Sequence, residues 1–235
     1  MLTLCHHAML PQSRRIRLLL SELQLDFQLE SYNFWLRDEA LLRLNPAGNL
    51  PILITQSQNT IVGARPIAEF LREFFIDLEQ TELSVGKRIA PYLFGESLAD
   101  RAEIRRLVDW FDDKFEREVA DFIVGEKIYK RLAKMGEPDP ALLRAGGLNL
   151  DTHLKYLDYL LNRREWLASD YMSIADLAAA ASLSLLDYLG EVPWNSHERI
   201  KAWYMNIKHR PSFRPVLNDR QPGFPPHRDY HNLDF

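Results

Sequence analysis

The chain has 235 residues, of which 46% are hydrophobic and 26% are charged, ordinary values for a globular protein. They exclude a disordered or fibrous chain, and the length allows one large domain or two ordinary ones around a substantial core. The formal charge of −4 argues against a dedicated nucleic-acid binder, which would be clearly basic. The single cysteine, Cys5, excludes an internal disulfide and a thiolate metal cluster, and it suits a reducing cytoplasm.

No segment predicts insertion into a membrane. The longest apolar run, residues 177–186, contains two serines and is much shorter than the roughly 20 residues that span a bilayer. The N-terminus lacks the basic region, apolar stretch and small-residue cleavage site of a signal peptide. We therefore expect a cytoplasmic protein.

The first third of the chain alternates short apolar runs with helical patterns. The runs predict strands at residues 2–5, 27–32, 52–55 and 59–62, and the patterns predict helices at residues 12–23, 38–44 and 66–75. This order, βαβ followed by ββα, is typical of a thioredoxin-like domain. The β–α–β crossover makes the first two strands parallel, and the crossover itself is expected to be right-handed.

Beyond residue 81 the sequence shows helical patterns and no convincing strand. We place the domain linker in the polar, acidic stretch at residues 77–81. Helices are expected at residues 100–118, 150–162, 174–188 and 197–208, with a proline-rich interruption at 137–140. The sequence thus predicts an α/β domain at residues 1–78, an all-α domain at 82–215 and an extended tail at 216–235.

Two local signals mark helix ends in the second domain. Ser173 and Asp176 have the spacing of a capping box, in which each side chain satisfies a backbone amide at the helix start. Arg210 and Pro211 follow the last helix and stop it.

Taken in order, these features resemble the glutathione S-transferase family over about residues 1–215. The resemblance implies a cis peptide bond between Leu50 and Pro51, ahead of the third strand. In that family the residue before the cis-proline offers its backbone to a ligand's peptide, and the bond also has a structural role in the fold. The capping box at Ser173 and Asp176 matches the start of the family's central helix.

The resemblance also exposes a vacant catalytic position. Family members carry a Ser, Cys or Tyr just before the first helix, whereas Leu10 precedes Pro11 here and has no heteroatom. Ser13 is the nearest hydroxyl, and we expect it to cap the helix. Cys5 lies on the first strand, where a cysteine is usually a small buried apolar residue. We predict no catalytic residue.

A second departure concerns the site for the γ-glutamyl group of glutathione. Family members place an acidic residue and a serine before the third helix, where this chain has Gly63 and Ala64. Arg65 could attract a carboxylate, but it cannot accept a hydrogen bond from an ammonium group. Each polar ligand group left unpaired costs about 1–3 kcal/mol. We expect no cofactor, glutathione included.

Several charged clusters have ordinary structural interpretations. The adjacent His6 and His7 point to opposite faces of a strand, so a structural or surface role is expected and no metal site. Solvated helix faces account for two further groups, namely Asp109, Asp112 and Asp113, and Arg14, Arg15 and Arg17.

The last twenty residues, 216–235, contain prolines that prevent a helix, together with aromatic side chains that a disordered tail would lack. Two interpretations remain open: the tail packs back on the core, or it forms a docked strip that a partner protein reads. A loop aromatic, Trp35, is a second candidate contact. The predicted partner-binding residues are Trp35, Arg228, Asp229, Tyr230, Leu233, Asp234 and Phe235.

The missing hydroxyl, residues 106–115 and the last four residues together resemble a narrower family, the FtsZ-localised, transferase-like division proteins of alphaproteobacteria. The resemblance implies a non-catalytic homodimer at the division site that binds FtsZ filaments and curves or bundles them. The alternatives are a glutathione S-transferase acting on small electrophiles, and a transferase-like scaffold for another protein.

Overall fold

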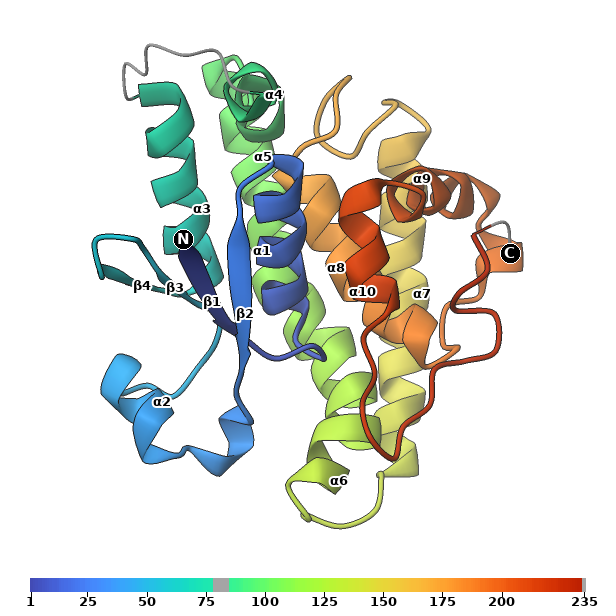
Figure 1. Ribbon diagram of the computed structural model, residues 1–235. Coiled ribbons are helices and arrows are strands. Elements are labelled where there is room, and N and C mark those ends of the chain that lie inside the picture. Colours follow the sequence, from blue (N-terminus) through green and yellow to red (C-terminus); the bar gives the residue numbers. More distant parts are fainter. Residues whose placement is uncertain (78–84, 234–235) are drawn as a thin grey trace.

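The computed structural model describes residues 1–77 and 85–233, in which a sheet with its helices lies beside a group of longer helices (Figure 1). The sheet contains β1 (Leu2–His6), β2 (Phe27–Ser31), β3 (Ile52–Ile54) and β4 (Thr60–Val62) in the order β2-β1-β3-β4. Strand β1 pairs parallel with β2 and antiparallel with β3, which in turn pairs antiparallel with β4. This is the thioredoxin-like arrangement that the βαβ and ββα order predicted.

Three helices accompany the sheet: α1 (Pro11–Glu22), α2 (Glu39–Leu44) and α3 (Ala64–Arg72). Helix α3 begins two residues earlier than expected and continues into a wider turn, Glu73–Asp77. The linker expected at residues 77–81 lies almost wholly outside the described residues, so the domain boundaries stay predictions.

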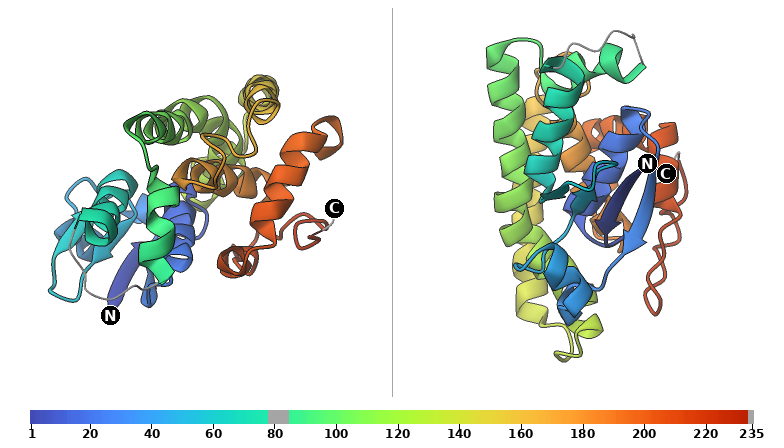
Figure 2. Two further views of the ribbon diagram at one scale, coloured as in Figure 1. Left: turned by 90° about the horizontal axis from the view of Figure 1, so that it is seen from above. Right: turned by 60° about the vertical axis from the view of Figure 1, so that its left-hand side comes forward.

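Helix α1 lies between the sheet and the helical part of the molecule (Figures 1 and 2). It contacts α3 on one side and α8 (Ile174–Tyr188) on the other, and ten of its twelve residues are buried. The exposure expected for Arg14, Arg15 and Arg17 is therefore wrong: none of the three exceeds 4% exposure. A helix enclosed on two sides has no solvated face, and its polar side chains must find internal partners.

The helical part begins with α4 (Val85–Phe94) and continues in one long helix, formed by α5 (Leu98–Asp109), a π-type stretch (Trp110–Tyr129) and α6 (Lys130–Leu132). The backbone stays helical where these segments join. The prediction of a helix at residues 100–118 found its core but neither end. Its start is set by a second capping box, in which Asp100 accepts from the Ser97 amide and the Ser97 hydroxyl accepts from the Asp100 amide.

The next helix, α7 (Pro140–Leu161), begins at Pro140 and not at Leu150 as expected. Asp139 caps its first turn by accepting from the Ala141 amide at 2.7 Å, and a proline is well suited to the first helical position. Gly146 lies against the long helix, since a Cβ there would be 2.8 Å from Ile123. A glycine inside the helix thus permits a close helix–helix contact.

Helix α8 is buried along its whole length and forms the centre of the helical part. Its capping box is confirmed, and Asp176 is completely buried there. Helices α9 (Glu198–Lys208) and α10 (Arg214–Leu217) follow, separated by a short turn at Pro211–Phe213 where the arginine–proline stop was expected. Among the described residues the helical part contains no strand, only an isolated bridge between Gln221 and Phe224. No helix in that described portion is long and apolar enough to cross a bilayer.

Candidate functional site

A groove with a volume of about 690 Å³ opens beside the turn that precedes β3. The peptide bond between Leu50 and Pro51 is cis, as expected, and the Pro51 carbonyl accepts a hydrogen bond from Gly63 at 2.9 Å. This bond brings the start of α3 next to the turn. Leu10 and Gln12 from the start of α1 form another wall, and Trp35 from the short helix Phe34–Leu36 forms a third.

The described residues that line this groove include no hydroxyl or thiol side chain. Leu10 occupies the position before α1, half-buried in the groove wall. Ser13 is fully buried, and its hydroxyl accepts from the His7 amide at 3.3 Å, so the expectation that it caps α1 is wrong. Cys5 is also fully buried, and its burial, together with the nearby Glu30, raises the pKa of its thiol to about 11.

The start of α3 offers few side-chain groups for a polar ligand. Gly63 has φ +93°, a conformation that favours glycine, and Ala64 carries no polar atom. Arg65 is exposed and pairs with Asp109 at the end of α5, at 3.2 Å. The side chains of Gly63, Ala64 and Arg65 therefore offer one cation and no hydrogen-bond acceptor to a ligand on this side of the groove.

The loop at residues 7–10 connects the groove to the interior. The Met9 carbonyl accepts a hydrogen bond from the Tyr129 hydroxyl, and the Met9 amide donates to His7 Nδ1 at 3.2 Å. The His7 ring meets Trp35 edge to face, with centroids 5.0 Å apart. Trp35 is half-buried, and its contact with His7 means that this loop supports the aromatic side chain predicted to contact a partner.

Both histidines of β1 and its loop are structural, as expected. His6 and His7 are 4% and 6% exposed. Burial, with the nearby Arg17 and His7, lowers the pKa of His6 to about 3, and burial likewise lowers that of His7 to about 4, so both are neutral at pH 7. The described residues contain no group of three or more His, Cys, Asp or Glu side chains that could hold a metal ion.

The acidic cluster on the long helix is only partly solvated. Asp113 is exposed and pairs with Arg117, as a surface residue would. Asp112 departs from the expectation: it lines the groove and accepts from Arg15 at 2.7 Å, with its side chain 25% exposed. One turn further on, burial and two neighbouring carboxylates raise the pKa of Glu116 to about 8. The sequence reasoning missed Glu116, which lies on the same inward side of the helix.

The tail packs back on the helical part. Tyr230 is completely buried, its ring meets Tyr188 at 5.1 Å, and its hydroxyl donates to the Val216 carbonyl at 3.3 Å. The prediction that Tyr230 contacts a partner is therefore wrong for this structure, because the side chain belongs to the core. Tyr188 makes three further hydrogen bonds to the tail. Its hydroxyl donates to the Phe224 carbonyl at 2.6 Å and accepts from the Gln221 amide at 3.2 Å, and its backbone carbonyl accepts from the His227 amide at 2.7 Å.

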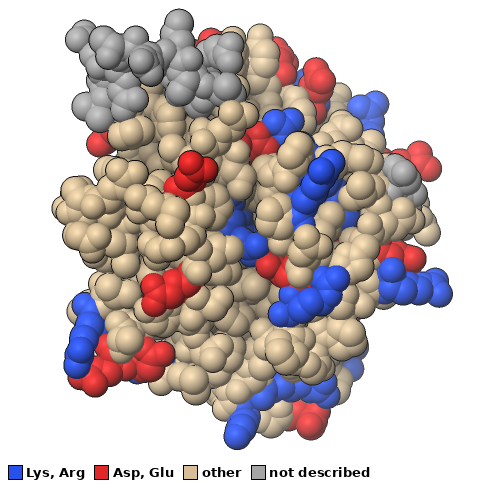
Figure 3. Space-filling view, in the orientation of Figure 1, with Lys and Arg blue, Asp and Glu red and all other residues tan. Residues whose placement is uncertain are grey.

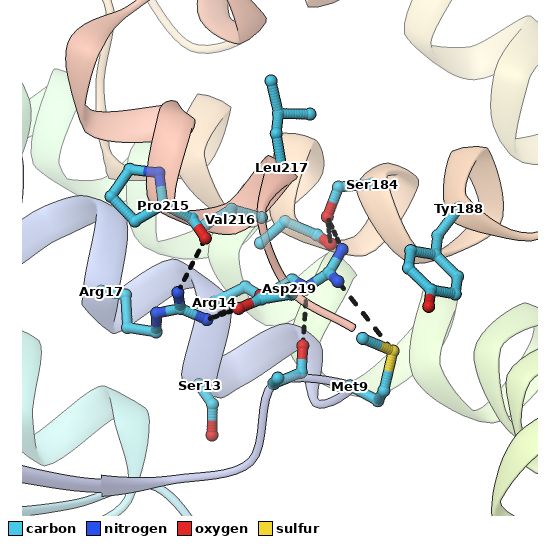
Figure 4. A network of polar contacts seen from close by, with 12 residues as sticks. Met9, Ser13, Arg14, Arg17, Ser184, Tyr188, Pro215, Val216, Leu217 and Asp219 are labelled. Atoms are coloured by element: carbon cyan, nitrogen blue, oxygen red, sulfur yellow. Dashed lines mark hydrogen bonds and ion pairs between the residues drawn. The ribbon is translucent and has the colours of Figure 1, made fainter. Parts of the chain in front are cut away.

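Two arginines of α1 hold the start of the tail (Figure 4). Arg17 donates to both carboxylate oxygens of Asp219, at 2.9 and 2.7 Å, and to the Pro215 carbonyl at 3.2 Å. Arg14 is completely buried and donates to the Ser184 hydroxyl at 2.8 Å and to the Tyr230 hydroxyl at 3.4 Å. Sequence reasoning missed this network because these two side chains lie 170 and 216 positions from Arg14.

The other predicted tail contacts differ in exposure. The side chain of Arg228 is 87% exposed and that of Asp229 is 52% exposed, while Leu233 packs partly against the core. Asp234 and Phe235 lie outside the described residues. On the face shown in Figure 3, basic side chains gather over the helical part, whereas the sheet-containing part is mostly uncharged.

Both parts of the chain match known protein families. Residues 11–73 match the glutathione S-transferase N-terminal domain, and residues 149–211 match the glutathione S-transferase C-terminal domain. FtsZ-localized protein A from Caulobacter vibrioides is 45% identical over 234 residues, which cover 99% of this chain and 98% of that protein.

Two solved structures have similar overall coordinates. FzlA from C. crescentus has a TM-score of 0.90 at 44% identity and covers 100% of this chain and 99% of its own. A protein from Rhodospirillum rubrum F11, named as a glutathione S-transferase, has a TM-score of 0.90 at 42% identity with both chains fully covered.

Proposed function

This chain belongs to the FtsZ-localized protein A family of glutathione S-transferase-like proteins, and we propose that it is a non-catalytic adaptor that binds FtsZ filaments and curves or bundles them at the division site. The family membership supports a role in cell division. The groove without a hydroxyl or thiol is the observation that carries the non-catalytic part of the proposal.

Transferase chemistry requires a group that stabilises the glutathione thiolate. At the position where family members place that group, this chain has Leu10, whose side chain lines the groove. The nearest alternatives, Cys5 and Ser13, are both fully buried, so neither can reach a ligand in the groove. No catalytic role is proposed for any of the three residues.

Glutathione itself is expected to bind weakly, and no cofactor is proposed. Gly63 and Ala64 provide no carboxylate or hydroxyl for the γ-glutamyl end. Losing two hydrogen-bond partners, at about 1–3 kcal/mol each, lowers affinity by between one and several orders of magnitude.

The proposed contact surface combines Trp35 with the exposed part of the tail. Trp35 offers a half-buried aromatic face at the groove mouth, and aromatic residues of this kind often anchor interfaces. Arg228, whose side chain is 87% exposed, adds a positive charge 3.3 Å from the Asp229 carboxylate. A homodimer, which the family resemblance implies, would present two such surfaces and cross-link filaments by avidity.

The test is co-sedimentation of the full chain with GTP-assembled FtsZ, with electron microscopy of the pellet. Stoichiometric pelleting with curved or bundled filaments is the expected result. Trp35→Ala and Arg228→Glu should reduce pelleting at least tenfold, whereas Lys155→Glu, an equal charge change at a 70% exposed side chain of α7, should not. Point variants are preferable to deleting residues 223–235, because the deletion would remove the buried Tyr230.

A parallel assay tests the enzyme alternative. Retention on glutathione resin together with turnover of a generic aryl halide would establish a transferase and overturn the non-catalytic proposal. Absence of pelleting at micromolar concentrations would overturn FtsZ binding. A pull-down would then be needed to find another protein partner.

A further inference from the structure

The two proposed contact regions, Trp35 and the tail, are joined by a continuous set of direct contacts through the buried interior. Arg14 is the central member: its Nε donates to the Ala8 carbonyl at 2.8 Å, and its other nitrogens reach Ser184 and Tyr230. One guanidinium thus touches the groove loop, α8 and the tail at once (Figure 4).

Asp219 holds this guanidinium and its neighbour in place. Its carboxylate lies 3.6 Å from Arg14 and 2.7 Å from Arg17, and its side chain is only 10% exposed. Both arginine side chains are at most 5% exposed, so Asp219 is the carboxylate that balances two buried cations. Removing one member of a buried ion pair is strongly unfavourable, because the remaining charge has neither water nor a partner.

From Arg14 the contacts continue to the groove. The Ala8 carbonyl belongs to the loop at residues 7–10, whose next residues, Met9 and Leu10, lead into the groove wall. Within the same loop, the His7 ring contacts Trp35 at 5.0 Å and Phe34 at 5.7 Å. Direct contacts therefore link the tail to Trp35 through Arg14 and this loop.

We propose that the tail is a latch: Asp219 and Tyr230, acting through Arg14, are positioning residues that hold the loop at 7–10 and the Trp35 side chain in their binding conformation. This inference rests on the proposed FtsZ-binding function for its consequence, but its structural content does not depend on FtsZ. Neither Asp219 nor Tyr230 needs to touch the partner to be required by it.

The first experiment is hydrogen–deuterium exchange by mass spectrometry on the full chain. Asp219→Asn should speed exchange at least tenfold at residues 8–10 and 33–37, while β3 and α7 keep their wild-type rates. The matched control is Glu22→Gln. Glu22 is a buried carboxylate at the other end of α1 that pairs with Arg210 at 2.6 Å, so it also ties α1 to the helical part but does not reach the loop.

A selective increase in Asp219→Asn, absent in Glu22→Gln, would support the latch. The latch would be overturned if exchange at residues 8–10 and 33–37 is unchanged in Asp219→Asn. It would also be overturned if the increase is spread evenly along the chain or is the same in Asp219→Asn and Glu22→Gln. Tyr230→Phe keeps the ring and removes only the hydroxyl. If Asp219→Asn does not fold, Tyr230→Phe tests the same proposal and should also speed exchange at residues 8–10 and 33–37.

FtsZ co-sedimentation then tests the consequence. Asp219→Asn should weaken pelleting about tenfold although its side chain is nearly buried, and Glu22→Gln should leave it unchanged. If the wild-type chain does not pellet, the proposed function fails while the exchange data still decide the latch. If the exchange is selective and pelleting is unaffected, the transmission to the binding surface is refuted.

Discussion

The replacement of Asp176 by alanine should destabilise the protein far more than the same change at Asp100, although both residues occupy the third position of a capping box. Asp176 is completely buried and accepts four hydrogen bonds of 2.8 to 2.9 Å, from the Leu167 and Ser173 amides, the Ser173 hydroxyl and the Trp203 indole. Asp100 accepts from the Ser97 amide at the protein surface, where water can replace it.

The magnitude follows from the donors left behind. In Asp176→Ala the Leu167 amide, the Ser173 amide and the Trp203 indole lose their acceptor inside the core, whereas the Ser173 hydroxyl can rotate. A buried donor without a partner costs about 1–3 kcal/mol, so three of them cost at least about 3 kcal/mol. The exposed cap at Asp100 is worth about 1 kcal/mol or less.

Urea unfolding at 25 °C, followed by circular dichroism, measures both variants. With an m value of about 3 kcal/mol/M for a chain of this size, Asp176→Ala should lower the midpoint by about 1 M or more and leave m unchanged. Asp100→Ala should lower it by about 0.3 M or less. Equal shifts in the two variants would refute the reasoning, because Asp176 differs from Asp100 in both the number and the burial of the donors that lose their acceptor.

Three further predictions concern buried titratable groups. The Cys5 thiol, whose pKa is raised to about 11, should not react with Ellman's reagent at pH 8 in the folded protein and should react fully in urea; rapid reaction of the native protein would contradict its burial. His6 and His7 have pKa values lowered to about 3 and 4, so the unfolded chain binds more protons below pH 6.5 and stability falls as the pH falls. Between pH 6.5 and 5 each histidine should lower the free energy of unfolding by about 1.5 kcal/mol, and His6→Leu should halve the combined loss. A pH-independent urea midpoint would be inconsistent with neutral histidines. The pKa of the Glu116 carboxyl is raised to about 8, so the stability of the folded protein falls as the pH rises from 4.5 to 8. Glu116→Gln should therefore stabilise the protein by about 1–3 kcal/mol at pH 8 and have little effect at pH 4. A destabilised variant at pH 8 would show that the interactions of the carboxylate, including the one with Gln12, outweigh the cost of its burial.

Local signals located most of the elements. The apolar periodicity found every strand to within two residues, and the box at Ser173 and Asp176 set the start of α8. Two helix starts that differ from the predicted ones also have local signals: Asp139 and Pro140 mark the start of α7, and Ser97 with Asp100 marks that of α5.

The groove could be predicted in part from the sequence. The cis bond at Pro51 and the small residues at 63 and 64 appear in the structure where the family resemblance put them, and Leu10 lines the same groove. These features depend on backbone geometry and on residue type at fixed positions in a known fold, which a linear sequence records directly.

The two-part fold and the aromatic content of the tail follow from the sequence alone. The folded arrangement alone shows that Arg14 and Arg17 are internal and that Tyr230 is a core residue. The same pattern of arginines forms a solvated face when only one side of the helix is covered. It forms a buried network when two sides of the helix are covered. Which of these holds depends on Ser184, Asp219 and Tyr230, which are close to α1 in space and remote from it along the chain.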